Sequence, residues 1–422
     1  MPENPNTALL HYSAAPVVGG VEAVMHAQVK QFLQHGYPVS VIAGRGEAEA
    51  QPEGAKFIQL PAMDSQREEI TRMSAELNQG RVPAEFEALT DQLTHDLQPV
   101  IEPYTHVIAH NILSKHFNLP LTAALMRLLD QGRLHHLIAW SHDFTWTSSH
   151  SREQVHPGYP WDLLRTYDSR ITYVTISRQR QKEWAGLLGC PVEKIHVVYN
   201  GVDPKELLGL SDQVAEFARR VGLWQAQLIM LMPVRVTQAK NIEFAIQVAR
   251  AIKERGLGIR LIVSGPPDPH DSASMEYFED LIAQVKRLDL QEEVRFVFNS
   301  GPNTGEAFIL SAVEIGELMR ISDLILMPSH REGYGMPVLE AGLSGIPFFS
   351  TPIPAAEEIG LPDVRIFQRD ASPEGVAGLI LNSFENDPIH ALKLRVRSRY
   401  TWEELFERSV LPLIDPERWK AS

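Results

Sequence analysis

Short apolar runs alternate with longer amphipathic segments along the 422 residues, and they do so in two successive series. Apolar runs of this near-continuous kind are typical of parallel strands that helices cover on both faces. A repeated strand-then-helix order implies right-handed crossovers and a doubly wound sheet. Because one hydrophobic core rarely organises a chain of this length, the pattern predicts an α/β protein with two Rossmann-like domains in tandem.

Each series predicts a definite set of elements. In the first, a helix is expected over residues 21–36, with its apolar residues on one face and Gly36 at its end. The expected strands of the first series are residues 7–12, 38–44, 105–111, 134–143, 171–178 and 195–199. The second series predicts strands over residues 228–235, 259–265, 294–299, 323–329 and 347–351, and helices over 241–256, 277–290 and 314–322.

The boundary between the two series is expected in the segment NGVDPKELL at residues 200–208, where a turn signal and a proline follow a strand. We therefore expect a first domain over residues 1–203 and a second over residues 204–400. The C-terminal segment YTWEELFERSVLPLI is expected to be helical.

The formal net charge of −14 disfavours two classes of partner. A sequence-independent hold on nucleic acid needs clustered Lys and Arg, as does adhesion to an anionic membrane, so we expect neither. The single cysteine, Cys190, cannot form an internal disulfide, which fits a reducing compartment. The N-terminal residues lack the pattern of a signal peptide, and no apolar run reaches the length of a membrane span. These features predict a cytoplasmic protein.

Ligands bind to open parallel sheets at the carboxyl ends of the strands, so the loops that follow strands are the candidate sites. The first such loop ends in Gly19 and Gly20, where a helix is expected to begin. Unobstructed backbone N–H groups at a helix start can receive a phosphate, and a tight turn that needs glycine is the alternative. The loop lacks both the GxGxxG pattern of dehydrogenases and the GK[ST] of a P-loop.

The corresponding loop of the second series, PVRVTQAKNIEF, carries Arg235 and Lys240. Arginine offers a planar fork for phosphate oxygens and lysine a compact charge, so the two could bind one diphosphate without a metal. The alternative is a pair of solvated surface charges.

Two carboxylates mark the stretch HREGYGMPVLEAGLSG, which follows another expected strand. Glu332 precedes Gly333 and Gly335, which let backbone approach a ligand closely. Pro337 suits the first position of a helix, which places Glu340 about one turn inside it. A carboxylate accepts paired hydrogen bonds from vicinal hydroxyls, such as those of a ribose or a hexose. The alternative is two unrelated glutamates of an acidic chain.

Together these stretches resemble the family 4 glycosyltransferases, a large group of retaining enzymes with the GT-B fold. EGYGMPVLE is similar to the family's E-x7-E motif, and Arg235 and Lys240 to its R-x4-K. GGVE at residues 19–22, WSHD at 140–143 and NGVD at 200–203 add to the similarity. These motifs occur in the family's order and cover nearly the whole chain.

The resemblance implies the GT-B fold, with two Rossmann-like doubly wound domains facing a cleft and the C-terminal helix, about residues 401–422, packed back on the first domain. The catalytic residues that it implies are His142, Arg235, Lys240 and Glu332. The donor-binding residues that it implies are Gly19, Gly20, Arg235, Lys240, Gly333, Tyr334, Gly335 and Glu340.

The implied roles differ from residue to residue. Arg235 and Lys240 would neutralise the donor diphosphate, which Gly20 would also approach. Glu332 would contact the donor sugar and Glu340 would hold the ribose. Backbone groups of residues 333–335 would line the sugar. His142 would face the sugar and the acceptor, and the alternative for it is a satisfied histidine at a strand end.

Some features depart from the family pattern. Pro233 and Asn241 stand where glycine is common in the family, and the loop at 264–274 is longer than in the simplest members.

No D-x-D triplet for holding a divalent cation occurs in the sequence. The histidines at 135, 136, 142, 150 and 156 match no standard spacing of metal ligands, so we expect no metal site and no cofactor.

These observations predict a retaining, metal-independent glycosyltransferase. It would move a hexose of the glucose or mannose type from a nucleotide-diphosphate sugar to an acceptor hydroxyl, on a small soluble molecule. Two alternatives stay open: an enzyme like the UDP-N-acetylhexosamine epimerases, and a sugar-nucleotide-binding protein without catalysis. The first needs no acceptor, and the second would bind the donor tightly without turnover.

Overall fold

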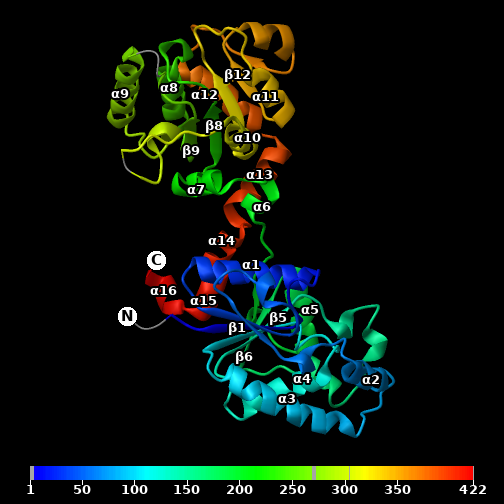
Figure 1. Cartoon of the computed structure of the whole chain (residues 1–422). Coiled ribbons are helices and arrows are strands. Elements are labelled where there is room, and N and C mark those ends of the chain that lie inside the picture. The colour runs from blue at the N-terminus through cyan, green and yellow to red at the C-terminus, as the bar shows by residue number, and fades with distance from the viewer. Residues whose placement is uncertain (1–3, 269–271, 304, 422) are drawn as a thin grey trace. The chain divides into compact units, whose positions relative to one another are not determined.

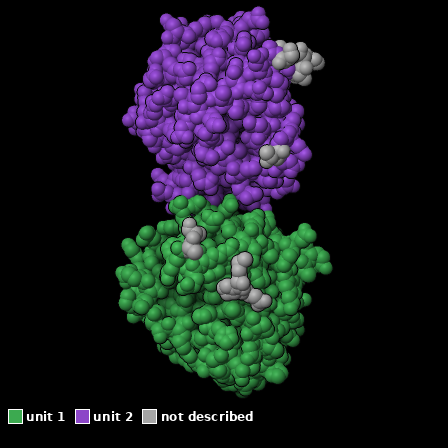
Figure 2. Space-filling model, turned by 90° about the vertical axis from the view of Figure 1, so that its left-hand side faces the viewer, with its two compact units in different colours: residues 1–201, 402–422 green, residues 202–401 purple. Residues whose placement is uncertain are grey.

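The computed structural model describes residues 4–268, 272–303 and 305–421. The chain forms two compact units, Met1–Gly201 with Trp402–Ser422, and Val202–Thr401 (Figure 2). It therefore passes from one unit to the other twice, after Gly201 and after Thr401, whereas the sequence patterns placed these points after residues 203 and 400.

In the first unit, the described residues form a seven-stranded sheet in the order β3-β2-β1-β4-β5-β6-β7, and each of these pairings is parallel. Figure 1 labels β1, β5 and β6 of this sheet. The strands are β1 (Thr7–Ser13), β2 (Val39–Arg45), β3 (Lys56–Gln59), β4 (His106–His110), β5 (Leu137–Ser141), β6 (Ile171–Thr175) and β7 (Ile195–Val197). The helices before the boundary are α1 (Gly20–Gln34), α2 (Glu68–Leu77), α3 (Glu85–Ile101), α4 (Leu119–Asp130) and α5 (Arg178–Leu188). Short 3-10 turns are η1 (Ala48–Ala50), η2 (Pro61–Met63), η3 (Thr145–Thr147), η4 (Arg152–Gln154), η5 (Trp161–Leu164) and η6 (Val192–Lys194).

The two faces of this sheet support two separate cores, because side chains alternate along a strand. Ala8, Leu10 and Tyr12 of β1 pack on the face covered by α2, α3, α4 and α5. Leu9 packs on the other face, with buried residues of α1. Helices on both faces explain why the strands have near-continuous apolar runs.

The C-terminal segment completes the face that α1 covers. It comprises α14 (Trp402–Leu405), the π-helical turn η10 (Phe406–Val410), α15 (Leu411–Ile414) and α16 (Pro416–Ala421). Phe406 packs edge-on against Phe32 of α1, with ring centroids 5.1 Å apart. The Tyr37 hydroxyl donates a hydrogen bond to Asp415 at 2.9 Å.

The NGVD segment has a structural explanation. A Cβ atom at Gly201 would come within 2.8 Å of the backbone nitrogen of Trp402, so the close approach of the two chain segments requires glycine. The Asp203 carboxylate accepts a hydrogen bond from the backbone N–H of Lys205 at 2.9 Å and caps the helix that follows.

The described residues of the second unit form a six-stranded parallel sheet in the order β10-β9-β8-β11-β12-β13. The strands are β8 (Leu228–Met232), β9 (Ile259–Val263), β10 (Val294–Phe296), β11 (Leu324–Met327), β12 (Phe348–Ser350) and β13 (Arg365–Ile366). The helices are α6 (Pro204–Leu208), α7 (Asp212–Arg220), α8 (Ile242–Lys253), α9 (Ser272–Arg287), α10 (Ala312–Ile321), α11 (Pro337–Ser344), α12 (Pro373–Phe384) and α13 (Pro388–Arg399). The remaining turns are η7 (Gln238–Lys240), η8 (Val297–Asn299) and the π-helical η9 (Ala356–Gly360).

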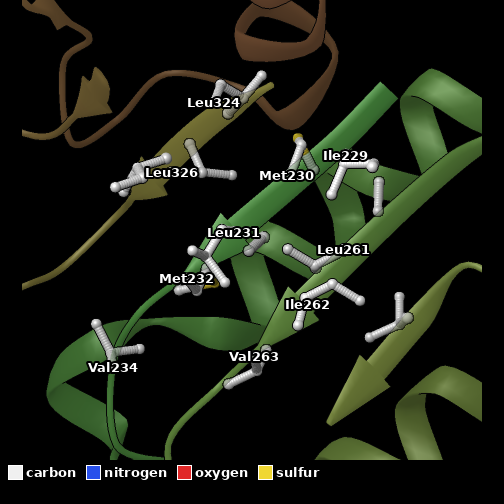
Figure 3. Close-up of a cluster of buried hydrophobic side chains, with 14 of the residues drawn as sticks. Ile229, Met230, Leu231, Met232, Val234, Leu261, Ile262, Val263, Leu324 and Leu326 are labelled. Carbon is white, nitrogen blue, oxygen red and sulfur yellow. The ribbon is translucent and has the colours of Figure 1, made fainter. Parts of the chain in front are cut away.

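The central strands β8, β9 and β11 carry the core of this unit (Figure 3). Every residue of β8 and β11 is buried, on both faces of the sheet. Full burial of one such aliphatic side chain stabilises the fold by about 1.5–3 kcal/mol.

The predicted class, two doubly wound parallel sheets in an α/β protein, is confirmed. Most of the predicted strands are shorter than expected, and two examples show by how much. The run at 294–299 is a strand only over Val294–Phe296 and then turns as η8, and the run at 134–143 is a strand only over Leu137–Ser141. The sequence patterns missed β3, because this edge strand is partly exposed and lacks a continuous apolar run.

A buried carboxylate joins α13 to the start of two central strands. The Asp323 side chain, fully buried, accepts hydrogen bonds from the backbone N–H of Ile229 at 2.8 Å and from the Arg397 guanidinium at 3.1 Å. Lys393 Nζ lies 3.2 Å from it. Burial alone would raise the pKa of Asp323, but the charges of Arg397 and Lys393 and the hydrogen bonds outweigh burial and lower it.

We predict that Asp323→Asn lowers the free energy of unfolding of the second unit by about 3–5 kcal/mol, because the substitution leaves the buried Arg397 charge without its carboxylate partner. The lowered pKa means that the wild-type contribution is present above the unfolded-state value and is lost as pH falls through the native value. Chemical denaturation of the two proteins at neutral and acidic pH measures both effects. The exposed Asp370→Asn in the same unit is the control, and equal destabilisation by both substitutions would contradict the prediction.

Candidate functional site

The second sheet has a switch point between β8 and β11, where the strand order changes direction. The chain runs outward from β8 through β9 to β10 on one side, and from β11 through β12 to β13 on the other. Leu324 and Ile325 of β11 pair with Met230 and Leu231 of β8. The loops after these two strands are therefore neighbours at the carboxyl edge, which is where open α/β sheets bind ligands.

Two of the predicted site residues meet at this switch point. Lys240, from the loop after β8, donates hydrogen bonds to both carboxylate oxygens of Glu332, from the loop after β11, at 2.6 and 2.7 Å. The side chains are 21% and 8% exposed, respectively, so the pair is largely removed from water. Ser329 Oγ donates a further hydrogen bond to Glu332 at 2.8 Å. Burying such charges costs desolvation free energy, so this pair is weak evidence for a stabilising role.

Asn241, which departs from the family pattern, holds Lys240 in place. Its backbone is left-handed, with φ of 52°, a conformation that asparagine tolerates better than most residues. Its side chain donates a hydrogen bond to the carbonyl of Pro328 at 3.1 Å, and the N–H of His330 donates to the carbonyl of Ala239 at 2.9 Å. These bonds tie the loop after β8 to the loop after β11, so asparagine replaces glycine here without losing the turn.

Arg235 lies in the same loop but points to a different neighbour. Its guanidinium, with the side chain 60% exposed, is 3.7 Å from the Asp268 carboxylate in the loop after β9. The two loops touch closely, because a Cβ at Gly265 would lie 2.4 Å from the carbonyl oxygen of Val234. The structure places Arg235 and Lys240 in one loop, without a direct contact between them among the described interactions.

The Gly-Tyr-Gly turn contains one glycine that the backbone requires. Gly335 has φ of 99°, and a Cβ there would lie 3.2 Å from the Ile353 side chain. Gly333 has open space around it, and the Tyr334 side chain is about half exposed. The Tyr334 carbonyl accepts a hydrogen bond from Ala355 N–H at 3.2 Å. The turn thus presents Gly333 and the Tyr334 ring to solvent.

Glu340 lies one turn further on. Helix α11 begins at Pro337, as expected, and Glu340 is exposed in its first turn. The structure therefore separates the two carboxylates of the E-x7-E stretch into a buried, paired Glu332 and a solvated Glu340.

In the first unit, α1 begins at Gly20, with Gly19 as the capping residue. Ser13 Oγ donates a hydrogen bond to the Glu22 carboxylate at 2.5 Å, and the Glu22 side chain is 11% exposed. A carboxylate therefore already lies in the first turn of the helix whose start was predicted to receive phosphate, where the helix dipole favours negative charge.

His142 belongs to a buried group of three histidines, the histidine cluster His11, His110 and His142. His110 Nδ1 and His142 Nε2 are 3.2 Å apart, and His11 Nδ1 is 2.9 Å from the carbonyl oxygen of His110. The backbone N–H of His142 donates to the side chain of Asn111 at 2.8 Å, which fixes the loop after β5. β1 and β4 are neighbours at the switch point of the first sheet, so the cluster lies at its ligand-binding edge.

Burial keeps these imidazoles uncharged near neutral pH. It lowers the pKa of His142 to about 4, with a smaller effect from His11, and lowers the pKa of His110 well below its usual value. The pKa of His11 is also lowered by burial, although its hydrogen bond to His110 and the nearby Glu22 oppose the shift.

Sequence reasoning missed several residues of these two sites. His11 and His110 are the last or nearly last residues of two strands that the topology makes neighbours, and their strand-end positions were the available signal. Ser329 and Asp268 likewise follow strands, but short polar residues in loops are too common to single out.

A cavity of about 460 Å³ lies away from the strand ends of the second unit. Its lining residues, including Arg250 and Glu254, come from the helices α8, α9 and α12.

Within residues 4–268, 272–303 and 305–421, no group of three or more His, Cys, Asp or Glu side chains could hold a metal ion. In the same residues, no helix is long and apolar enough to cross a membrane.

We predict that the imidazole of His142 titrates near pH 4 in the folded protein, as its lowered pKa requires. Because the unfolded chain takes up a proton near pH 6.5, protonation favours unfolding between the two values and stability falls as the pH drops. NMR titration, with the signal assigned from a His142→Asn variant, measures the native pKa. A midpoint near 6.5 would show that the cluster is open to water.

Two family models match successive parts of the chain. Residues 18–206 match Glycosyltransferase Family 4, and residues 214–399 match the glycosyl transferases group 1.

Three curated relatives illustrate the range of similar proteins. An uncharacterized glycosyltransferase of Methanocaldococcus jannaschii is 26% identical over 257 residues, which cover 59% of this chain and 61% of the relative. The D-inositol 3-phosphate glycosyltransferase of Actinosynnema mirum is 27% identical, with coverage of 46% and 42%. The glycogen synthase of Mycobacterium tuberculosis is 26% identical, with coverage of 61% and 56%. The matches thus span less than two thirds of the length of these relatives.

Similar solved structures include the Anabaena protein HepE in complex with UDP, at 15% identity with a TM-score of 0.34, covering 97% of this chain and 99% of HepE. The glycosyltransferase WaaG of lipopolysaccharide biosynthesis is 15% identical with a TM-score of 0.33, covering 98% of this chain and 99% of WaaG. The two family regions follow one another from residue 18 to residue 399, and the chain belongs to the family 4 glycosyltransferases.

Proposed function

We propose that this protein is a retaining glycosyltransferase that moves a hexose of the glucose or mannose type from a nucleotide-diphosphate sugar to an acceptor hydroxyl, without a metal or other cofactor. The observation that carries the proposal is the Lys240–Glu332 pair at the switch point of the second unit. Family membership supplies the reaction class. The relatives named for acting on an inositol phosphate or for synthesising glycogen support a hydroxyl acceptor.

The pair keeps bonding capacity for a donor. A lysine ammonium has three donors, and two of them reach Glu332, so one stays available for a phosphate oxygen. Glu332 has accepted bonds from Lys240 and Ser329, and its carboxylate oxygens can accept more from sugar hydroxyls. Arg235, exposed in the same loop, would add a guanidinium to the diphosphate.

Residues that are exposed to solvent would make the remaining contacts with the donor. The solvated Glu340 would hold the ribose hydroxyls, and backbone groups of Gly333, Tyr334 and Gly335 would line the sugar. Backbone N–H groups of Gly19 and Gly20 at the start of α1 would approach the diphosphate, provided that the Glu22 carboxylate turns away from the helix start.

In the transfer step, the bond from the anomeric carbon to the diphosphate oxygen breaks and a bond from that carbon to the acceptor oxygen forms. Negative charge develops on the departing diphosphate, where Lys240 and Arg235 stabilise it most. The acceptor proton passes to a phosphate oxygen of the leaving group, which balances the reaction without a protein base. The neutral His142 would orient the sugar or the acceptor through Nδ1, since Nε2 faces His110.

We predict that Lys240→Ala weakens binding of the preferred nucleotide, among UDP, GDP and ADP, by roughly 10- to 100-fold, since charge-assisted hydrogen bonds of about 1.5–3 kcal/mol are lost. Calorimetry in buffer with EDTA measures the affinity and tests the independence from metal. The rate of transfer from the matching glucose and mannose conjugates should fall by at least the same factor.

Two further variants make this test specific. Lys253→Ala, at the other end of α8, is the matched control and should bind normally. Because Lys240→Ala leaves Glu332 unpaired, the double variant with Glu332→Gln should stay weak if the lysine itself binds phosphate. Recovery of affinity in the double variant, or normal turnover in Lys240→Ala, would overturn the proposal. Release of nucleotide without any acceptor would favour an epimerase-like reaction, and binding without turnover would favour a non-catalytic role.

A further inference from the structure

A small cavity of about 230 Å³ opens in the first unit. It is lined by Ser65, Gln66, Thr71, Ser74, Ala75, Asn78, His116 and Phe117. The lining comes from the chain just before α2, from α2 itself and from the loop after β4.

The position of this cavity in the fold favours a ligand. His116 and Phe117 follow β4, and Ser65 and Gln66 belong to the connection that follows β3. β4 borders the switch point of the first sheet, so part of the cavity is formed by a loop at the carboxyl edge.

The cavity is also connected to the histidine cluster. The Phe117 ring packs edge-on against Tyr12 at 5.9 Å between centroids, and Tyr12 lies 4.9 Å from the His11 ring. On the other side, His116 Nδ1 is 3.0 Å from Thr145 Oγ1, three residues after His142. A molecule in the cavity would therefore lie next to two side chains, Phe117 and His116, that contact Tyr12 of β1 and Thr145 of the loop after β5.

The lining is polar but uncharged. Its hydroxyls and amides both donate and accept hydrogen bonds. Burial and the nearby Lys115 lower the pKa of His116 to about 4, so this imidazole is neutral at physiological pH. Lys115 Nζ lies 5.0 Å from the centre of the Phe117 ring, in a cation-π contact, and is not among the lining residues. Phe117 is 41% exposed and adds an aromatic side chain to the lining.

We infer that this cavity binds the acceptor, and that the acceptor presents one uncharged sugar or cyclic polyol ring to it. The inference rests on the proposed function and specifies its acceptor. The volume is below the ~300–1,000 Å³ typical of pockets for drug-sized ligands, which suits a single ring. Hydroxyl and amide side chains match the alternating donors and acceptors of a polyol, and the Phe117 ring suits its apolar face. The eight lining residues include no Lys or Arg for an anionic group.

Saturation-transfer NMR on the full chain tests this inference, with D-glucose, D-mannose, D-galactose and myo-inositol as probes and their monophosphates as charged counterparts. Ser74→Trp, which fills the cavity with an indole, should abolish the signals of the neutral rings. Arg72→Trp is the matched control, because Arg72 is exposed on the same helix and does not line the cavity. Phe117→Ala, which adds no volume, should weaken the same signals. It replaces Ser74→Trp as the test if that variant does not fold.

The outcomes separate the two proposals. Binding of a neutral ring that is lost in Ser74→Trp and kept in Arg72→Trp supports the inference. Binding of the monophosphates alone, no binding of any neutral ring, or neutral binding unaffected by Ser74→Trp overturns it. The affinity of the same samples for the nucleotide tests the second unit independently. If the cavity does not bind the ring, nucleotide binding stays normal, and if the donor site does not bind the nucleotide, ring binding stays normal.

Discussion

The pairing of β8 with β11 is the constraint on which the candidate donor site depends. These strands are far apart in the sequence, and their parallel register brings the loops after them together. Lys240 and Glu332 are 92 residues apart along the chain, yet two hydrogen bonds between their loops, from Asn241 to Pro328 and from His330 to Ala239, hold them at bonding distance. A ligand at this edge therefore meets a prearranged pair of opposite charges, and little has to reorganise on binding.

The first unit applies the same topology with different chemistry. β1 and β4 are neighbours at its switch point, and they bring His11 and His110 to the carboxyl edge. Burial keeps these imidazoles uncharged, so the Glu22 carboxylate is the charged group beside them, whereas the second edge carries the cations of Lys240 and Arg235. The two sheets thus provide two kinds of binding edge from one strand-and-helix pattern.

The sequence predicts the fold class and the succession of strands and helices along the chain, because buried parallel strands leave long apolar runs and their helices leave one apolar face. It also identifies Lys240 and Glu332 as candidates, but the contact between them depends on strand order, which no local pattern contains. Edge strand β3 and the histidine cluster were missed for related reasons. The first is too short and exposed to have a clear period, and His110 is an ordinary strand-end residue until β1 lies beside it.

The contrast between the edges bears on how one chain could handle two substrates of different charge. A nucleotide-diphosphate sugar is an anion, and the exposed Arg235 and the free donor of Lys240 favour it at the second edge. At the first edge, His142 is neutral and the Glu22 carboxylate lies at the start of α1, so the helix start can receive an anion only once Glu22 has turned away. The Glu22 carboxylate does not repel an uncharged ring. Electrostatics alone would thus direct the donor to the second unit and an uncharged acceptor to the first, which is discrimination by unfavourable as well as favourable contacts.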